Sequence, residues 1–316
     1  MTGLRMVVWS MAAAVTGGVL SWGAAHTSPH EGPVPSEHYR ESWPDGSWLD
    51  GRDGHLGTIG RIRLTQPVEA GTYRYRVSRD AAIEEARRNL RRTAPALLID
   101  GTRRLADEPV LLERVRRLID ALEPRNERIG RGRFFEVEIR LPIRGLSGVL
   151  GMILEWGGTP PPASPAGDVD AATGLVIDMS HLVEESQRPS VSLLPRILDE
   201  DGRVVYSIDL IDHDQARERG LVAWMMPGQE DSAEETASLI GDRPMWIRGV
   251  ATGGDHRADL VIGNDDAGRV RSLGERSSIL QECRVMVIMP RPPMKSATPA
   301  ERPTPERPHQ DPNRLH

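Results

Sequence analysis

Cysteine is almost absent from this sequence. Cys283 is the only cysteine among 316 residues. An intramolecular disulfide and a cluster of thiolate metal ligands are therefore both excluded. Cys283 begins an apolar run that extends to Met289, and no histidine stands near it in sequence to activate the thiol. We expect Cys283 to be a small core residue rather than a nucleophile.

The motifs of the common catalytic and nucleotide-binding sites are also missing. The sequence contains no G-x-x-x-x-G-K-[ST] phosphate loop, no G-x-G-x-x-G, no H-E-x-x-H and no serine in a nucleophile elbow. These absences leave no residues to which a reaction or a cofactor could be assigned. The sequence therefore predicts a protein that is not an enzyme, has no catalytic residues and carries no cofactor.

Basic residues are fewer than acidic residues, and lysine occurs only at position 295. The 40 Lys and Arg residues are outnumbered by 46 Asp and Glu, which gives a net charge of −6. This balance gives no electrostatic argument for binding nucleic acid or an anionic membrane surface. Apolar residues make up only 38% of the chain, whereas Pro (25) and Gly (31) are frequent, so part of the length is expected to be linker and tail.

The N-terminal residues have the three parts of a secretory signal peptide. Arg5 supplies the positive charge, Met6 to Leu20 is mostly apolar, and Gly23-Ala24-Ala25 is a small-residue cleavage site. The alternative, an uncleaved membrane anchor, is disfavoured because the apolar run is short and contains Thr16-Gly17-Gly18. We expect cleavage near Ala25 and a periplasmic or envelope-associated product.

Composition and hydrophobic periodicity divide the chain further. Thr-Pro-Pro-Pro-Ala-Ser-Pro, from position 159, cannot continue a helix or a central strand. The predicted parts are a signal peptide (1–25), a flexible lead-in (26–58), an N-terminal α+β domain (59–156), a Pro-rich linker (157–170), a C-terminal β-rich α+β domain (171–290) and a disordered Pro-rich tail (291–316).

The first half predicts a small sheet packed by two helices in the order β-α-β-α-β. Alternating apolar and polar residues predict strands at 61–64, 73–77 and 133–141, and a short apolar run predicts another at 96–99. One helix begins near Ser78 or Asp80, buries Ile83, Ala86, Leu90 and Ala94, and ends at Pro95. A second helix spans 108–122, with Leu111, Val115, Leu118, Ile119 and Leu122 on one stripe.

The second half predicts strands separated by short helices. Two apolar runs flank Asp201-Gly202, which is a hairpin signal because glycine tolerates the positive φ of a tight turn. Further strands are expected at 173–178, 245–250, 258–262 and 283–289. Helices are expected from Asp212 or Asp214 through Met225, at 231–240, and from Asn264.

Three groups of residues could bind a metal ion. Asp209, Asp212, His213 and Asp214 form an acidic cluster with a histidine, but a strand end followed by a helix cap explains them better. Asp199-Glu200-Asp201-Gly202 resembles the start of a calcium loop without its distal Glu. His26, His30, His38 and His55 have no ligand spacing and are interpreted as solvated loop histidines.

Several short motifs occur in the order found in a known family. They are Thr173 to Asp178, Leu194 to Gly202, Val205-Tyr206, Ala258 to Ala267 and Cys283-Arg284-Val285. Together with the helix that carries Ala86 to Leu90, they resemble the bacterial Lpp-twenty-type envelope lipoproteins and their non-lipidated relatives, over about residues 79–290. The resemblance implies export to the periplasm or outer membrane, a flagellar or surface-assembly role in some members, and no enzymatic activity.

The chain departs from that family at three places. The lipid-carrying cysteine is missing, the segment after the first motif is Met179 to Val183 instead of small residues, and Ser207 follows the Val-Tyr pair where glycine is frequent. The leading hypothesis is an exported envelope protein that acts through contacts with other envelope proteins, with peripheral outer-membrane association. The alternatives are a metal-dependent or small-molecule-binding periplasmic protein and a calcium- or peptidoglycan-binding module.

Overall fold

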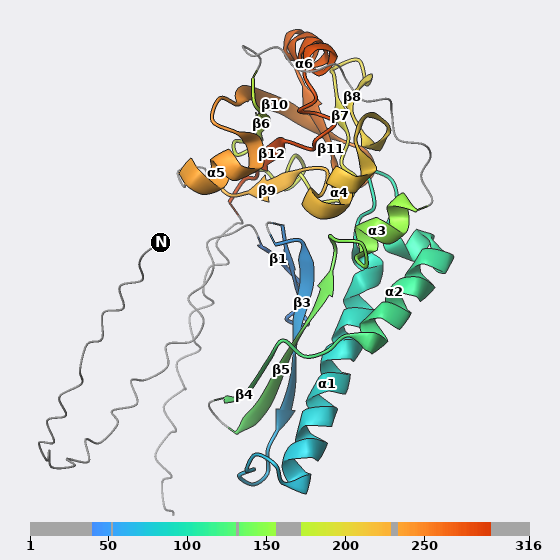
Figure 1. Ribbon diagram of the computed structural model, residues 1–316, viewed down its shortest axis with the longest axis vertical. Helices are drawn as coiled ribbons and strands as arrows, with labels where there is room; N and C mark the ends of the chain where they lie inside the picture. Colours follow the sequence, from blue (N-terminus) through green and yellow to red (C-terminus); the bar gives the residue numbers. More distant parts are fainter. Residues whose placement is uncertain (1–39, 52, 131–132, 156–171, 229–232, 292–316) are drawn as a thin grey trace, which may run out of the picture. The chain divides into compact units, whose positions relative to one another are not determined.

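The structure is a computed structural model, and it describes residues 40–51, 53–130, 133–155, 172–228 and 233–291 (Figure 1). All of these residues belong to one compact unit. Helices and sheets are mixed, so the predicted α+β class is confirmed. The predicted signal peptide, the whole of the Pro-rich linker and all of the tail except Arg291 lie outside the described residues.

The first sheet is antiparallel throughout, with the strand order β1-β2-β3-β5-β4. Its strands are β1 (Arg40–Ser42), β2 (Trp48–Asp50), β3 (His55–Arg63), β4 (Asn126–Gly130) and β5 (Phe134–Pro142). The alternation predicted for 133–141 is confirmed, because Phe135, Val137, Ile139 and Leu141 are all buried.

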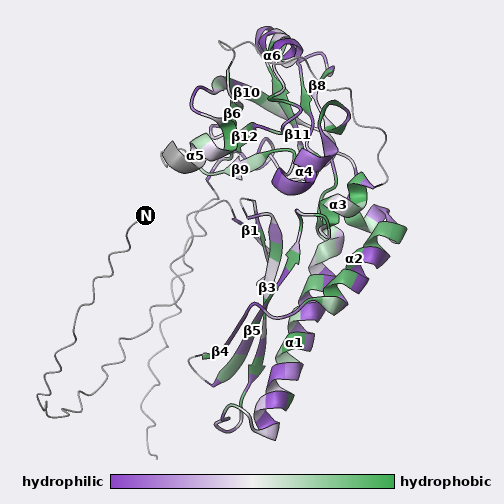
Figure 2. Ribbon diagram, viewed as in Figure 1, coloured by the Kyte–Doolittle hydropathy of each residue, from purple (hydrophilic) through white to green (hydrophobic). Residues whose placement is uncertain are grey.

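Two helices cover this sheet on one side. The long α1 (Tyr73–Thr93) packs on β3 and β5, and α2 (Pro109–Ala121) packs on α1 (Figure 1). In Figure 2 hydrophobic and hydrophilic residues alternate along both helices, as amphipathic helices require. The apolar stripe predicted for α1 is buried, and Leu111, Val115 and Ile119 of the α2 stripe are buried as well.

The predicted β-α-β-α-β order is wrong in detail. Residues 40–58, expected as a flexible lead-in, instead form β1, β2 and the start of β3, since Trp48, Leu49 and Leu56 pack into the structure. The strand expected at 73–77 is the first part of α1, which Thr72 caps by accepting a hydrogen bond from the backbone N–H of Tyr75. The strand expected at 96–99 is reduced to single bridges from Leu98, and β4 was not predicted.

The second sheet has seven strands in the order β8-β7-β11-β10-β6-β12-β9 and mixes parallel and antiparallel pairs. The strands are β6 (Leu175–Asp178), β7 (Ile197–Leu198), β8 (Val204–Tyr206), β9 (Ala223–Met225), β10 (Met245–Gly253), β11 (Asp259–Ile262) and β12 (Val285–Ile288). The α-helices that follow α1 and α2 in the chain are α3 (Val149–Leu154), α4 (His213–Arg219), α5 (Ala233–Ile240) and α6 (Asn264–Arg276).

The predicted hairpin forms, with β7 and β8 antiparallel around Gly202, whose φ is 78°. The helix predicted from Asp212 through Met225 is wrong at its end. It stops at Arg219 because Gly220 adopts a φ of 79°, and the apolar residues that follow form β9. The strand expected from residue 283 begins at Val285, after Cys283 has taken a φ of 55°.

The two faces of the second sheet differ in what covers them. One face, with Leu175, Ile177, Ile247 and Val287, joins the main core. The other face contains Val176, Met225, Met286 and Ile288, which form a separate small cluster with Ile240 of α5.

The outer face of β10 continues that second face, since Trp246 pairs with Val176. There the side chains of Trp246, Arg248 and Val250 are exposed. We call these three residues the β10 strip.

The two sheets share one hydrophobic core, although the sequence predicted two separate domains. The main cluster of buried side chains contains residues of both sheets. Backbone contacts also join the halves, because Leu98 bridges to Ser192 and the N–H of Gly145 donates to the carbonyl of Arg217 at 2.6 Å. None of the helices in the described ranges has the length and hydropathy needed to cross a membrane.

Candidate functional site

The acidic cluster predicted from the sequence does not gather around a common point. Asp212 is the N-cap of α4, and its Oδ1 accepts from the backbone N–H groups of Asp214 and Gln215 at 2.8 and 3.2 Å. Asp214 pairs with Arg217 at 2.6 Å, and Asp209 lies in the preceding 3-10 turn (Ile208–Leu210). The side chains of Asp212 and Asp214 are exposed, and that of His213 is half-buried. The structure thus uses these residues as caps and surface ions.

The calcium-loop resemblance at Asp199 has a structural explanation too. Asp199 is buried, and its Oδ1 accepts from the N–H groups of Asp201 and Arg203, which closes the hairpin turn. Its Oδ2 pairs with Arg271 of α6 at 2.8 Å. The Arg271 guanidinium holds the pKa of Asp199 below its ordinary value. The carboxylate therefore fastens the hairpin to α6.

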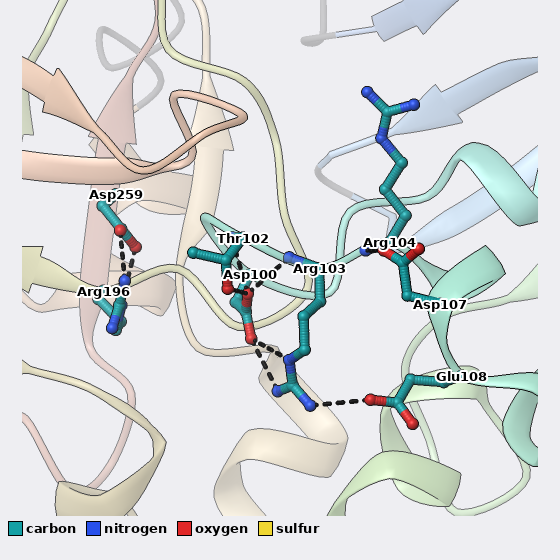
Figure 3. A network of polar contacts seen from close by, with 8 residues as sticks. All are labelled: Asp100, Thr102, Arg103, Arg104, Asp107, Glu108, Arg196 and Asp259. Carbon is teal, nitrogen blue, oxygen red and sulfur yellow. Dashed lines mark hydrogen bonds and ion pairs between the residues drawn. The ribbon is translucent and has the colours of Figure 1, made fainter.

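Figure 3 shows two groups of polar contacts, one within the loop before α2 and one between Arg196 and Asp259 of β11. Asp100 accepts from the N–H groups of Thr102 and Arg103, and the Arg103 guanidinium bridges Asp100 and Glu108. Arg196 and the buried Asp259 form a two-point ion pair, with Nε to Oδ1 at 3.0 Å and an Nη to Oδ2 at 2.6 Å. All of these side chains are used in holding backbone segments together.

Glycine is required where this loop meets the turn between β10 and β11. A Cβ on Gly101 would overlap the carboxylate of Asp259, and one on Gly254 would lie 2.5 Å from the carbonyl oxygen of Gly101. The N–H of His256 donates to that same carbonyl at 3.0 Å. The Gly253 to His256 segment, interpreted from sequence as a turn, is such a turn and serves close packing.

The one group of metal-type ligands that converges within the described residues lies in the turn between β2 and β3. One oxygen of Asp50, one oxygen of Asp53 and one ring nitrogen of His55 lie within 4.8 Å of one another. Asp50 and His55 are buried, whereas Asp53 is exposed. The prediction that His55 is a solvated loop residue is therefore wrong, because β3 begins at this residue and carries it inward. His26, His30 and His38 lie outside the described residues.

Sequence reasoning missed this group because it treated residues 26–58 as a lead-in. The available signal was Asp50-Gly51, then Asp53-Gly54-His55, between the apolar residues Trp48-Leu49 and Leu56. That is a glycine-containing turn between two apolar segments, which is a hairpin pattern. Both acids and the histidine fall at or beside the turn.

Two arginines lie near these carboxylates. Arg40 is 3.8 Å from Oδ2 of Asp50 and stacks over Trp48, with 4.9 Å from its Cζ to the ring centroid. Arg144 donates to the carbonyl of Gly51 at 3.0 Å. Burial lowers the pKa of Arg144, while Asp50 and Asp53 act in the opposite direction. The group is therefore a mixed-charge cluster rather than a bare acidic one.

A cavity of about 30 Å³ adjoins Asp50 and Arg144. Its wall also includes Ser192, whose buried Oγ has no hydrogen-bond partner, and Trp224. A cavity of this volume holds one or two water molecules and is far below the roughly 300 Å³ of an organic ligand site. It has room for a water molecule beside Ser192 and gives no support to a small-molecule site at this position.

Cys283 is only 5% exposed, as the core interpretation predicted. Burial raises the pKa of its thiol to about 12. The thiolate is the reactive form, so the folded protein should be nearly inert towards thiol reagents. We expect labelling of native protein to be slower than that of denatured protein by about a hundredfold or more, measured with an aromatic disulfide reagent at pH 8. Labelling of the native chain as fast as that of free glutathione would contradict this.

Comparison with known families gives one match. Residues 174–291 match the family model described as Treponema pallidum Tp0624, second domain. The matched segment contains β6 to β12, and it is less than half of the chain. A search of curated proteins found no match. The resemblance to Lpp-twenty-type lipoproteins stays a prediction.

Proposed function

We propose that this chain is an exported, non-enzymatic cell-envelope protein that acts by binding other envelope proteins, with outer-membrane or flagellar and surface assembly as its setting. The signal-peptide pattern and the resemblance to envelope lipoproteins support the location. The similarity of residues 174–291 to a domain of a Treponema protein is compatible with a bacterial domain that recurs in other architectures.

The observation that carries the contact function is the β10 strip. Trp246 and Arg248 are exposed on the same face of β10, and Trp246 is 50% exposed. Val250, which is 45% exposed, lies beside them on the same strand, where the register with β11 shifts between Gly249 and Ala251. Tryptophan and arginine are the residues most enriched at the energetic centres of protein interfaces. Among the described residues Arg248 forms no ion pair. The strip therefore fits a partner surface that places apolar side chains around a carboxylate.

The alternative centred on Asp209, Asp212, His213 and Asp214 has less support. Capping and ion pairing already use Asp212 and Asp214. No structural observation favours a small-molecule site there, so the contact function is the better proposal.

Position-specific crosslinking tests the contact function. A photo-reactive amino acid in place of Trp246 should give a discrete crosslinked species in cells, and Arg248→Glu in the same chain should remove it by charge reversal. The same photo-reactive residue at Arg117, an exposed α2 position with 76% of its side chain accessible, is the control and should give no such species. Equal crosslinking from both positions, or none from position 246, would contradict the proposal.

Location needs its own measurement, because crosslinking alone cannot establish it. We expect a C-terminally tagged chain to fractionate with the periplasm or outer membrane and to lose its first 25 or so residues. Recovery of the full-length chain in the cytoplasm would exclude an envelope role.

A further inference from the structure

We propose that the turn between β2 and β3 binds one divalent transition-metal cation of the zinc class, with Asp50, Asp53 and His55 as its protein ligands. Two carboxylates and one imidazole are a ligand set that suits zinc and its neighbours better than magnesium or calcium, because imidazole nitrogen is a borderline ligand. This proposal is independent of the contact function.

The distances suit a single ion after a small adjustment. The three ligand atoms lie within 4.8 Å of one another. Around an ion with bonds of about 2.1 Å, ligand atoms stand roughly 3.4 Å apart in a tetrahedral site and roughly 3.0 to 4.2 Å apart for ligand angles between 90° and 180°. Asp53 is exposed and can rotate to close the remaining gap. Its exposure also gives the ion a path from solvent.

The histidine supplies the second observation. Only 7% of the surface of His55 is exposed, and its Nε2 has no hydrogen-bond partner. Buried side-chain nitrogens in folded proteins are nearly always satisfied by a protein group, a water or an ion. Burial first, and then the charge of Arg140, lowers the pKa of His55, against the opposing effects of Asp50, Asp53 and Glu138. A neutral imidazole is the form that coordinates metal.

Asp50 is already oriented for such a role. Its Oδ1 accepts from the backbone N–H of Asp53 at 2.8 Å, so the carboxylate is fixed relative to the turn. Hydrogen bonds of this kind position metal-ligating carboxylates. With three protein ligands the ion keeps at least one open position, which water or a partner's side chain would fill.

Arg40 and Arg144 oppose the cation. Arg40 has a 40% exposed side chain and can turn towards solvent when the ion binds. The proposal therefore makes a distinctive prediction, which is that Arg40→Gln strengthens metal binding. A merely structural cluster would show no such gain.

Calorimetric titration of the full chain with Zn²⁺, after removal of metal by a chelator, tests the site. We expect one tight equivalent per chain, and Mg²⁺ and Ca²⁺ should bind at least about a hundredfold more weakly. Asp53→Asn and His55→Gln should each weaken Zn²⁺ binding about tenfold or more. The matched controls His213→Gln and Asp214→Asn should leave it unchanged, and a chain with His26, His30 and His38 replaced by Gln should also retain it.

Two results would overturn the proposal. One is the absence of Zn²⁺ binding by the wild type, and the other is unchanged binding in Asp53→Asn. Asp53 is exposed, so Asp53→Asn is expected to fold. This variant therefore tests the site even if the buried substitution His55→Gln prevents folding. Circular dichroism of each variant checks the fold. Cobalt(II) substitution gives an independent readout, because loss of the imidazole ligand in His55→Gln should change the visible absorption spectrum.

Discussion

Replacing Gly60 by alanine is expected to destabilise the protein by about 3 kcal/mol or more. Gly60 lies in β3, on which α1 packs, and the helix backbone passes close to it. A Cβ at this position would overlap the carbonyl oxygen of Ala82 and would lie 2.6 Å from the backbone nitrogen of Ala86. Both obstructing atoms belong to the helix backbone, which cannot rotate away as a side chain could. The only relief is separation of α1 from β3, and the core between them would be lost.

Gly268 provides a matched control for the same chemical change. It lies inside α6, is exposed, and a Cβ there would meet nothing within 4 Å. Gly268→Ala should therefore stabilise the protein by roughly 0.5 to 1 kcal/mol, because alanine is the better helix former. Urea denaturation of both variants measures the two free energies of unfolding. A Gly60→Ala protein within 0.5 kcal/mol of wild type would show that α1 does not pack on β3 as described.

Breaking the Arg196–Asp259 ion pair should have a cost that depends on which partner is removed. Asp259 is 1% exposed, whereas the Arg196 side chain is 39% exposed. Arg196→Met leaves a carboxylate buried without its charge partner, and we expect a loss of about 3 kcal/mol, the low end for buried pairs because Arg196 reaches solvent. Asp259→Asn leaves a guanidinium that water can solvate, and we expect a loss of about 1 to 2 kcal/mol.

The double variant makes this asymmetry a strict test. In Arg196→Met with Asp259→Asn, no charge is left buried, so the double variant should be more stable than Arg196→Met alone. The unfolding free energies of wild type, both single variants and the double variant form a complete cycle. If the loss of unfolding free energy in the double variant equals the sum of the losses in the two single variants, the two side chains do not stabilise each other. That result would contradict the two short contacts between them.

The elements predicted correctly are those whose signal is local. The apolar stripe of α2, the alternation in β5 and the Asp201-Gly202 turn each lie within about a dozen residues, and each is set by its own periodicity or turn chemistry. The cap at Asp212 is local in the same sense, which is why the structure uses the acidic cluster as the capping interpretation predicted.

The wrong predictions come from patterns that tertiary structure overrides. Tyr73 and Val77 alternate with arginines, which is a strand signal, but they lie in the first turns of α1 with 74% and 49% exposure. Side chains so exposed gain little from the burial that would hold the segment in a sheet. The β2–β3 turn was missed because its segment is rich in Gly and Asp, a composition that is typical of a linker. The burial of Trp48 and Leu56, which makes the segment part of the sheet, is a property of the tertiary structure.

Sheet order depends on pairings that no local pattern contains. β6 at 175–178 pairs in parallel with β10 and with β12, which are distant in sequence from β6 and from each other. The approach of His55 to Asp50, by contrast, follows from the pairing of β2 with β3 across a short turn. The metal-type cluster could therefore have been recognised from sequence once these residues were interpreted as a hairpin.

The position of β6 between β10 and β12 in the second sheet also affects when this part of the chain can fold. A growing chain has no sheet partner for Leu175–Asp178 until β10 ends at residue 253, and it lacks the second partner until β12 ends at residue 288. Closing such long loops is entropically costly and slow. During synthesis, Val176 and Ile177 therefore remain unpaired for a long interval. A segment that stays unpaired in this way remains accessible to chaperones, which act on unfolded polypeptide.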